Sequence, residues 1–404
     1  MTSRSAQETH RAATPLELFF DLCFVVAVAQ ASGVLHHDLA EGHFGHAVSS
    51  YLFVFFAIWW AWMNFTWFAS AYDTDDDYYR LTTLVQIAGA LILAAGIPKA
   101  FGGDFLIATM GYVVMRLAMV GQWLRAARED PPRRATALRY AIGVAVVQIC
   151  WVLRLAFDQP WYVYIGWALI VAELAVPIWA ERAQMTTWHP QHITERYGLF
   201  TLIVLGEAVL AATIAIQVAA DLVHGIGADL LLLAGAGLVL VFSMWWLYFD
   251  RTKQELLRSL RSAIIWGYGH YFIFASTAAV GAGLAVAADD LSGHAHMSHL
   301  AMGLTVGVPV AVWILWVWWL HACPLLRGPV VAASPVAATL VLAAAWTPAP
   351  VPVIALIVAV LAAVTTWGLR RLDPVTTRRS GPDNRQPRRL RRVRRAPTPP
   401  GRAA

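Results

Sequence analysis

The sequence predicts an all-α fold, a polytopic bundle of transmembrane helices, and three observations support this prediction. The chain of 404 residues is 59% hydrophobic and only 14% charged, whereas a soluble domain is about 25% charged. Its mean hydropathy is +0.57. It contains about 12 apolar stretches of the length, roughly 20 residues, that a helix needs to cross a bilayer. So much apolar surface excludes a soluble enzyme and a disordered chain.

The expected spans follow one another along the whole chain. We place them at Leu16–Leu35, Ala47–Ala71, Leu81–Ile97, Phe105–Leu124, Leu138–Phe157, Tyr162–Ala180, Tyr197–Ala219, Ala228–Phe249, Ala263–Ala288, His299–Leu320, Val330–Trp346 and Val351–Leu369. The eleventh is the shortest and contains Pro335, so the last two could instead pair as an irregular hairpin. Ten to twelve spans is therefore the expected range. The first stretch holds Glu17 and Asp21 and has no cleavage site of small residues, so we expect it to remain as a helix.

The two halves of the chain resemble each other at an offset of 186 residues. Phe56–Trp60 (FAIWW) aligns with Phe242–Trp246 (FSMWW), and Asp21 falls on Glu207. Because six spans is an even number, the halves would have the same orientation, as in a parallel repeat about the membrane normal. We therefore expect two six-helix repeats, residues 1–190 and 191–369, with Asp21 and Glu207 at equal depths.

Basic residues predict the orientation. Of the 30 Lys and Arg residues, Lys99 alone falls in a connection on one side of the membrane, while Arg116 and Arg154 fall inside spans. Basic connections stay in the cytoplasm, so both termini should be cytoplasmic. Arg154, near the outer end of its span, should reach the interface. The basic tail, 370–404, should be disordered and bind anionic lipid headgroups rather than nucleic acid.

Charged residues within the spans are the candidate functional site. A charge at the bilayer centre costs at least about 2.5 to 3.5 kcal/mol, so each needs a partner, a proton or water. Arg116, Glu173 and Glu207 are expected near the midplane, where two carboxylates would face one guanidinium. A proton or a small cation would balance the excess charge. The alternative is a buried ion pair that only fixes helix packing.

Further polar residues extend this set toward the cytoplasm. Glu17 and Asp21 are four residues apart and so share one face of the first helix. Asn64 and Gln86 are expected at a similar depth. Together these side chains would line an acidic path from the cytoplasm to the midplane.

Other chemistry has little support. Phosphate-binding, dinucleotide-binding, hydrolase and zinc-protease motifs are missing from the sequence, so we expect no enzymatic activity and no cofactor. Histidines are common in the expected outer connections, where we interpret them as solvated loop residues rather than metal ligands. The favoured function is a transporter or channel for a small cation or a proton-coupled solute. A structural or sensory membrane protein is the alternative, and a membrane-embedded enzyme is less favoured.

Two segments resemble the hallmark motifs of the bacterial low temperature requirement A family. They are Thr14–Phe24 (TPLELFFDLCF) and Ile193–Glu207 (ITERYGLFTLIVLGE), and the second includes the motif residues Glu195, Arg196 and Gly206. The family commonly has Val in place of Cys23 and Ser in place of Ala208. The resemblance extends nearly to Leu369. It implies a multi-pass protein of the bacterial inner membrane, possible adaptation to cold, and no settled activity.

A second resemblance is more distant. Phe20 and Asp21 followed by Phe24 are similar to the F-S-D motif that opens each six-helix repeat of the endolysosomal potassium channel family. The segment Leu205–Glu207 departs from that motif.

Overall fold

The computed structural model describes residues 12–222, 227–250, 257, 259–323 and 329–372. All regular structure in these ranges is helical, which confirms the predicted fold class. The main helices are α1 Pro15–Ala40, α2 Phe44–Tyr72, α3 Asp77–Phe101, α4 Leu106–Glu129, α5 Arg134–Arg154, α6 Trp161–Glu181, α7 Pro190–Leu222, α8 Ala228–Phe249, α9 Leu260–Leu291, α10 His299–Val317, α11 Ala333–Ala343 and α12 Pro350–Leu372. Short helical turns η1 Pro131–Arg133, η3 Trp318–Ala322, η4 Pro329–Ala332 and η5 Ala344–Trp346 join or extend them.

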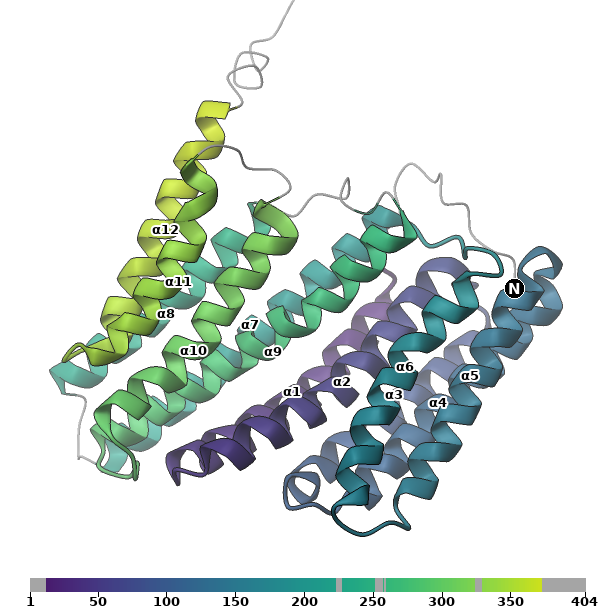
Figure 1. Ribbon diagram of the computed structural model, residues 1–404, viewed down its shortest axis with the longest axis horizontal. Helices are drawn as coiled ribbons and strands as arrows, with labels where there is room; N and C mark the ends of the chain where they lie inside the picture. The colour runs from purple at the N-terminus through teal and green to yellow at the C-terminus, as the bar shows by residue number, and fades with distance from the viewer. Residues whose placement is uncertain (1–11, 223–226, 251–256, 258, 324–328, 373–404) are drawn as a thin grey trace, which may run out of the picture.

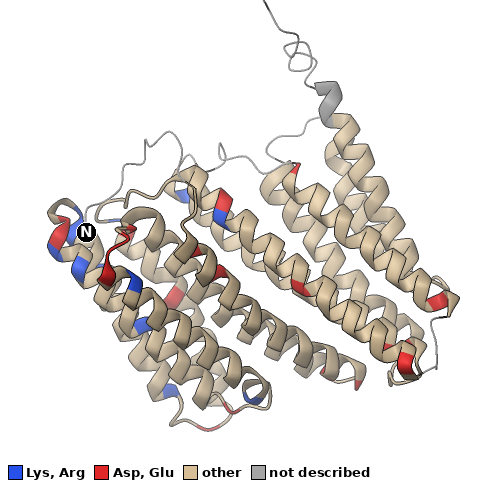
Figure 2. Ribbon diagram, turned by 180° about the vertical axis from the view of Figure 1, so that it is seen from behind, with Lys and Arg blue, Asp and Glu red and all other residues tan. Residues whose placement is uncertain are grey.

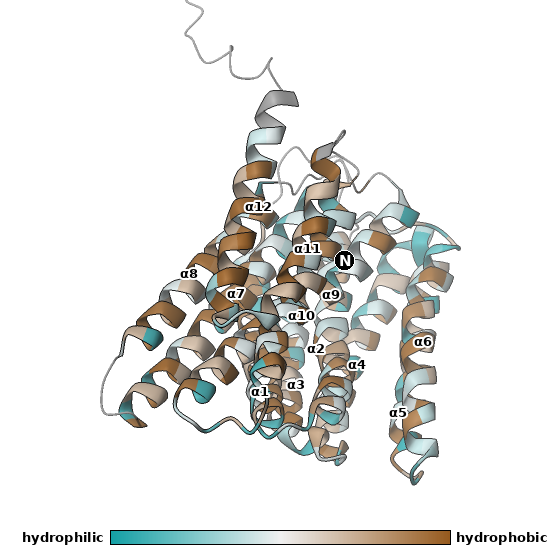
Figure 3. Ribbon diagram, turned by 60° about the vertical axis from the view of Figure 1, so that its left-hand side comes forward, coloured by the Kyte–Doolittle hydropathy of each residue, from teal (hydrophilic) through white to brown (hydrophobic). Residues whose placement is uncertain are grey.

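Within the described ranges, eleven helices are long and apolar enough to cross a membrane. The remaining apolar stretch, Val330–Trp346, is shorter and breaks into η4, α11 and η5, in line with the short eleventh span expected from the sequence. Large apolar side chains such as Leu117, Val171 and Leu231 are more than 60% exposed, as lipid-facing residues are. Figure 3 shows hydrophobic residues along the outer helices α6, α8 and α12, and Figure 2 shows how few charges lie along the helices. The protein is a multi-pass membrane protein.

The helices form two groups that lie side by side (Figure 1). Helices α1 and α2 of the first group contact α7 and α9 of the second. The two groups have corresponding helix contacts. In the first, α1 packs on α2 and α3, and in the second, α7 packs on α8 and α9. Successive helices also pack on one another from α3 to α6 and from α9 to α12. Duplication of the halves remains a prediction.

Local sequence explains where several helices begin. Thr14 and Glu17 form a capping box at the start of α1, with Pro15 in the first turn, and together they satisfy amide groups that the helix itself cannot pair. Asp76 caps α3 and Ser298 caps α10. Small residues set the packing of α3 on α4, because a Cβ atom on Gly96 or Gly111 would collide with the backbone of the facing helix. Such close approach is typical of membrane helix pairs.

Helix α7 differs from the prediction in a way that matters for the site. It begins at Pro190, seven residues before the predicted start at Tyr197. The sequence between them is polar, but its side chains pair with α1, so the helix extends beyond the apolar core. The predicted tail, 370–404, lies outside the described residues from residue 373 onward.

Candidate functional site

Polar contacts between α1 and α7 run along one seam. Glu17 pairs with His192, and Asp21 pairs with Arg196. Ser32, whose hydroxyl donates to the carbonyl of Ala278 in α9, lies beside Glu207. In each pair the two residue numbers differ by 175, so the two helices lie parallel in one fixed register. We call this row of contacts the α1–α7 seam.

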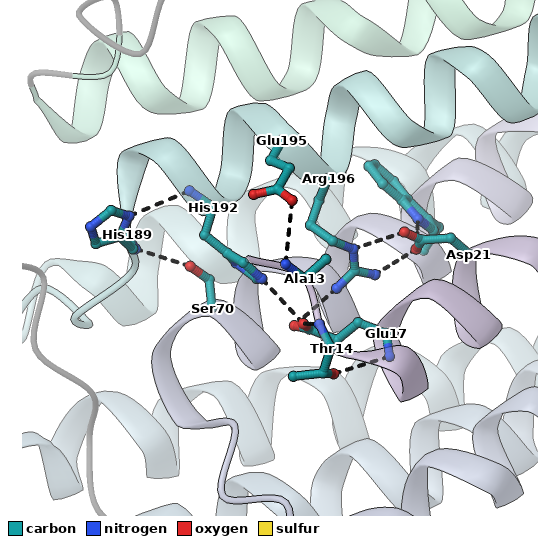
Figure 4. A network of polar contacts seen from close by, with 10 residues as sticks. Ala13, Thr14, Glu17, Asp21, Ser70, His189, His192, Glu195 and Arg196 are labelled. Atoms are coloured by element: carbon teal, nitrogen blue, oxygen red, sulfur yellow. Dashed lines mark hydrogen bonds and ion pairs between the residues drawn. The ribbon is translucent and has the colours of Figure 1, made fainter. Parts of the chain in front are cut away.

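Arg196 is the centre of the cytoplasmic part of the seam (Figure 4). Its Nε donates to Asp21 Oδ2 at 2.8 Å and its Nη2 to Asp21 Oδ1 at 2.5 Å. Its Nη1 lies 3.1 Å from Glu17 Oε1. All three side chains are 0% exposed. A planar guanidinium is suited to this bidentate recognition of a carboxylate.

Neighbouring groups complete the hydrogen bonding of the two acids. The Trp62 indole Nε1 donates to Asp21 Oδ1 at 2.6 Å. Glu17 Oε2 accepts from the backbone amide of Thr14 at 2.8 Å and lies 3.2 Å from His192 Nε2. The capping box of α1 is therefore part of the same cluster.

With both acids ionised, the charges of Glu17, Asp21 and Arg196 do not cancel. Glu17 and Asp21 together carry two negative charges, and Arg196 supplies one positive charge. A proton on His192 can supply the second. Uncompensated charge in a buried site costs several kcal/mol, so a proton on His192 would stabilise the cluster.

A second ion pair lies within the first group of helices. Arg116 Nη2 of α4 donates to Glu173 Oε2 of α6 at 3.1 Å, and both side chains are at most 4% exposed. The Trp60 Nε1 also donates to Glu173 Oε2, at 2.8 Å, and Arg116 donates to the Tyr112 hydroxyl at 2.8 Å. Here the charges balance.

Glu207 lies apart from both clusters. Its side chain is 5% exposed and faces Ser32 and Tyr51. No lysine or arginine pairs with it in the part of the chain that the structure describes. It is 17 residues from the start of α7, hence about 26 Å along the helix. Glu207 is therefore the buried acid of the seam that lacks a charged partner within the described ranges.

These placements change the predicted polar path. Asp21 and Glu207 were expected at equal depths, but the register of 175 separates them by 11 residues, about 16 Å along the helices. The buried side chains Phe24, Val28, Phe200 and Val204 occupy the interval. Glu207 does not join Arg116 and Glu173 either, so the predicted three-residue cluster is reduced to one pair.

Two predicted residues make separate contacts. Asn64 donates to the carbonyl of Trp60 at 2.7 Å, within its own helix. Gln86 donates to Gln122 at 3.0 Å between α3 and α4. Neither makes a hydrogen bond to the acids of the seam in the described part of the chain.

Arg154, the last residue of α5, is enclosed by other side chains. It is 3% exposed, its Nε donates to the carbonyl of Tyr162 at 2.7 Å, and its guanidinium lies 3.5 Å from the centre of the Tyr162 ring. The rings of Phe53, Phe105 and Trp151 also lie over it. The guanidinium is therefore stabilised by cation–π contacts with these rings.

Two histidines expected in outer connections, His36 and His299, belong to helices α1 and α10 and contact other parts of the protein. His36 Nε2 lies 2.6 Å from Asp289 Oδ2, and His299 Nε2 lies 2.9 Å from the carbonyl of Thr347. Within the ranges described above, no three His, Cys, Asp or Glu side chains gather closely enough to hold a metal ion.

Arg196, His192 and Trp62 had no predicted role at the site, although Arg196 was noted as a motif residue. A signal was available for Arg196, because it lies in the same motif segment as Glu207. The pairing itself requires the register of α1 against α7, which the sequence does not contain.

The similarity of the chain to known protein families identifies its own family. The model of the family described as bacterial low temperature requirement A protein (LtrA) matches residues 12–366. The chain belongs to the LtrA family. This match includes both segments that form the seam.

One curated relative is also similar. It is a protein of Rhizobium meliloti (strain 1021) named "Uncharacterized protein RA0937", which is 30% identical over 255 residues. That alignment covers 59% of this LtrA chain and 58% of the relative, so the chain spans little more than half of the relative's length. No solved structure matches the chain.

Proposed function

We propose that this LtrA protein transports a small cation, or a solute coupled to protons, along the α1–α7 seam. The observation that supports this proposal is the excess of acid in the seam. The seam contains three acids, Glu17, Asp21 and Glu207, but one arginine, Arg196, which pairs with the first two. A membrane protein retains such unbalanced acids at a cost. Binding and release of a cation would explain why the protein keeps these acids despite that cost.

The two levels of the seam support a path with a barrier. Asp21 and Glu17 lie near the start of α1, and Glu207 lies about 16 Å farther along. The apolar side chains between them, such as Phe24 and Phe200, are fully buried. The seam also joins the two groups of helices, so a small movement of one group against the other would change access to each acid.

The alternative is a structural role for the charges. It is favoured by the complete bidentate pairing of Arg196 with Asp21, which would lock α1 against α7 without any transport. Glu207 distinguishes the two functions, because it has no such pairing within the described ranges.

The setting follows from the same proposal. The protein would lie in the bacterial inner membrane. Both termini would be cytoplasmic, because basic residues gather on one side of the expected spans. In Figure 1, α1 begins and α12 ends at the same edge of the bundle. The basic tail would bind anionic lipid headgroups. No enzymatic activity and no binding of nucleic acid are proposed.

The proposal is tested by measuring flux into reconstituted vesicles. Protons, alkali cations and divalent cations are tested in turn. Glu207→Gln should reduce the flux of the active cation at least tenfold. The matched control is Glu129→Gln, which neutralises a glutamate that is 39% exposed at the end of α4 and should leave flux within twofold. Equal flux from wild type and Glu207→Gln would contradict the proposal.

A further inference from the structure

A groove of about 540 Å³ lies between the two groups of helices. Its walls come from α1 and α2 of the first group and from α9 and α10 of the second. Helix α9 contacts α1, α2 and α10 and lies between α10 and α1 (Figure 1), so it forms the floor. The volume of the groove falls within the range of ligand sites, about 300 to 1,000 Å³.

The groove continues the lipid-facing surface of the protein. Phe44, Val48 and Val308 at its edges are 39%, 46% and 46% exposed. Tyr51 and Ala275 at its floor are each 3% exposed. It is therefore a concave part of the surface that contacts the hydrocarbon of the bilayer. Side chains beside a void lose van der Waals contacts, and the surrounding membrane supplies acyl chains that can restore them.

The hydroxyl groups in the groove wall already have hydrogen-bond acceptors. Three hydroxyl-bearing residues line the groove, namely Tyr51, Ser276 and Thr305. Each donates its hydrogen to a backbone carbonyl, at 2.6, 2.5 and 2.7 Å respectively. The remaining side chains of the wall are aliphatic or aromatic. A hydrocarbon chain can therefore fill the groove without breaking a hydrogen bond.

The length of the groove matches one leaflet of a bilayer. The groove begins where helices end, because Leu39 lies at the end of α1, Phe44 starts α2 and Ala301 lies in the first turn of α10. Its wall extends from Phe44 to Leu52 along α2, about 12 Å, and from Ala301 to Trp316 along α10, about 22 Å. Half of a hydrocarbon core about 30 Å thick is about 15 Å. An acyl chain that enters from the membrane surface therefore fits along it.

Polar residues lie at the end of the groove where a headgroup would be. Phe44 also lines a surface hollow formed by Gly42–His46. His43 and His46 are exposed there, and an imidazole N–H can donate to a phosphate oxygen. A phospholipid, which joins apolar chains to a phosphate, complements both the groove and its end.

We propose that the groove binds one acyl chain of a membrane phospholipid, whose headgroup lies beside the start of α2. The chain packs on both groups of helices at once. It covers the contact of α2 with α9, where Tyr51 donates to the carbonyl of Ala275 at 2.6 Å and Tyr271 donates to the carbonyl of Leu52 at 2.7 Å. The bound lipid stabilises this contact between the two groups. The proposal does not depend on the transport function.

Native mass spectrometry tests the binding. The protein is reconstituted into vesicles of dioleoyl phosphatidylglycerol and dioleoyl phosphatidylethanolamine, extracted in mild detergent to remove loosely held lipid, and weighed. Ala279→Phe places a ring in the groove, because Ala279 lines it. Ala88→Phe is the matched control, since Ala88 is exposed on α3 and lies outside the groove.

We expect wild type and Ala88→Phe to retain one phospholipid per chain and Ala279→Phe to retain at least fivefold less. Val308→Phe should lower retention at least threefold, and it changes a residue at the edge of the groove that is not packed in the core. Equal retention by wild type and both groove variants would overturn the proposal. Retention of a free fatty acid, or of a second copy of the chain, in place of a phospholipid would also overturn it.

Two further measurements locate the lipid and test its effect. Phosphatidylglycerol with a diazirine in the middle of one chain, irradiated after extraction, should form cross-links within residues 272–279 and 301–316, and cross-links confined to other helices would overturn the site. Added dioleoyl phosphatidylglycerol should raise the melting temperature of wild type and Ala88→Phe more than that of Ala279→Phe, because a ligand of the folded state stabilises it. Equal shifts in all three would overturn the stabilising role.

Discussion

Replacing Asp21 with asparagine should destabilise the protein by about 3 kcal/mol, although the side chain keeps its shape. Arg196 donates two hydrogen bonds to Asp21, from Nε and from Nη2. The asparagine oxygen can accept one of them, but its amide group would face the other donor. A hydrogen bond to a charged group contributes about 1.5 to 3 kcal/mol, and an unpaired buried donor costs about 1 to 3 kcal/mol. Breaking a buried ion pair falls in the same range, about 3 to 5 kcal/mol.

The protein offers a matched control for this change. Asp75 accepts from Arg80 Nε and Nη2 at 2.9 Å each, the same bidentate arrangement, but both side chains are more than 50% exposed. Exposed pairs contribute little, so Asp75→Asn should have no measurable effect on stability.

Reversible unfolding in mixed micelles of mild detergent and SDS, followed by tryptophan fluorescence, measures both variants against wild type. Arg196→Lys provides a second comparison, because it keeps the charge and loses the planar fork; its loss of stability should be comparable to that of Asp21→Asn. If Asp21→Asn is no less stable than Asp75→Asn, the buried pair does not hold α1 against α7.

Two further predictions concern the ends of the helices. A reporter fused after Ala404 should be cytoplasmic and one within residues 289–298 should face outward, and opposite sides for the two chain termini would contradict this topology. Arg125 beside Asp76 lowers the pKa of that carboxyl below its ordinary value, so their pair should stabilise the connection of α2 to α3 above about pH 4 and be lost as the pH falls. In thermal melts from about pH 5 down to about pH 3, wild type should therefore lose more stability than Asp76→Asn, and equal losses would contradict this assignment.

The fold was predictable because the bilayer imposes simple requirements. A helix that crosses lipid must pair its own backbone groups and present apolar side chains, and both requirements are visible in a single sequence. The same reasoning placed Arg116 and Glu173 at a similar depth in the bundle, and the structure pairs them.

The seam was less predictable because it depends on contacts between helices distant in sequence. Hydropathy placed the start of α7 at Tyr197, and Arg196 was therefore expected in a connection. In the structure Arg196 lies within the helix, and its charge can be buried because Asp21 pairs with it. The offset of 186 suggested that Asp21 lies level with Glu207, whereas side-chain packing sets a register of 175 between α1 and α7. Likewise, the aromatic rings that enclose Arg154 come from α2, α5 and the residues near the starts of α4 and α6, a gathering that periodicity cannot reveal.

The most direct test of the account is the initial rate of cation entry into vesicles that contain wild type, Asp21→Asn or Glu207→Gln, at equal amounts of inserted protein. The two acids lie at different levels of one seam, so each should be required even if the other is intact. We predict a loss of at least tenfold in both variants, with normal insertion of Glu207→Gln, because neutralising an acid inside the membrane lowers the cost of insertion. Wild-type rates from both variants would contradict transport through the α1–α7 seam and leave these carboxylates as packing elements.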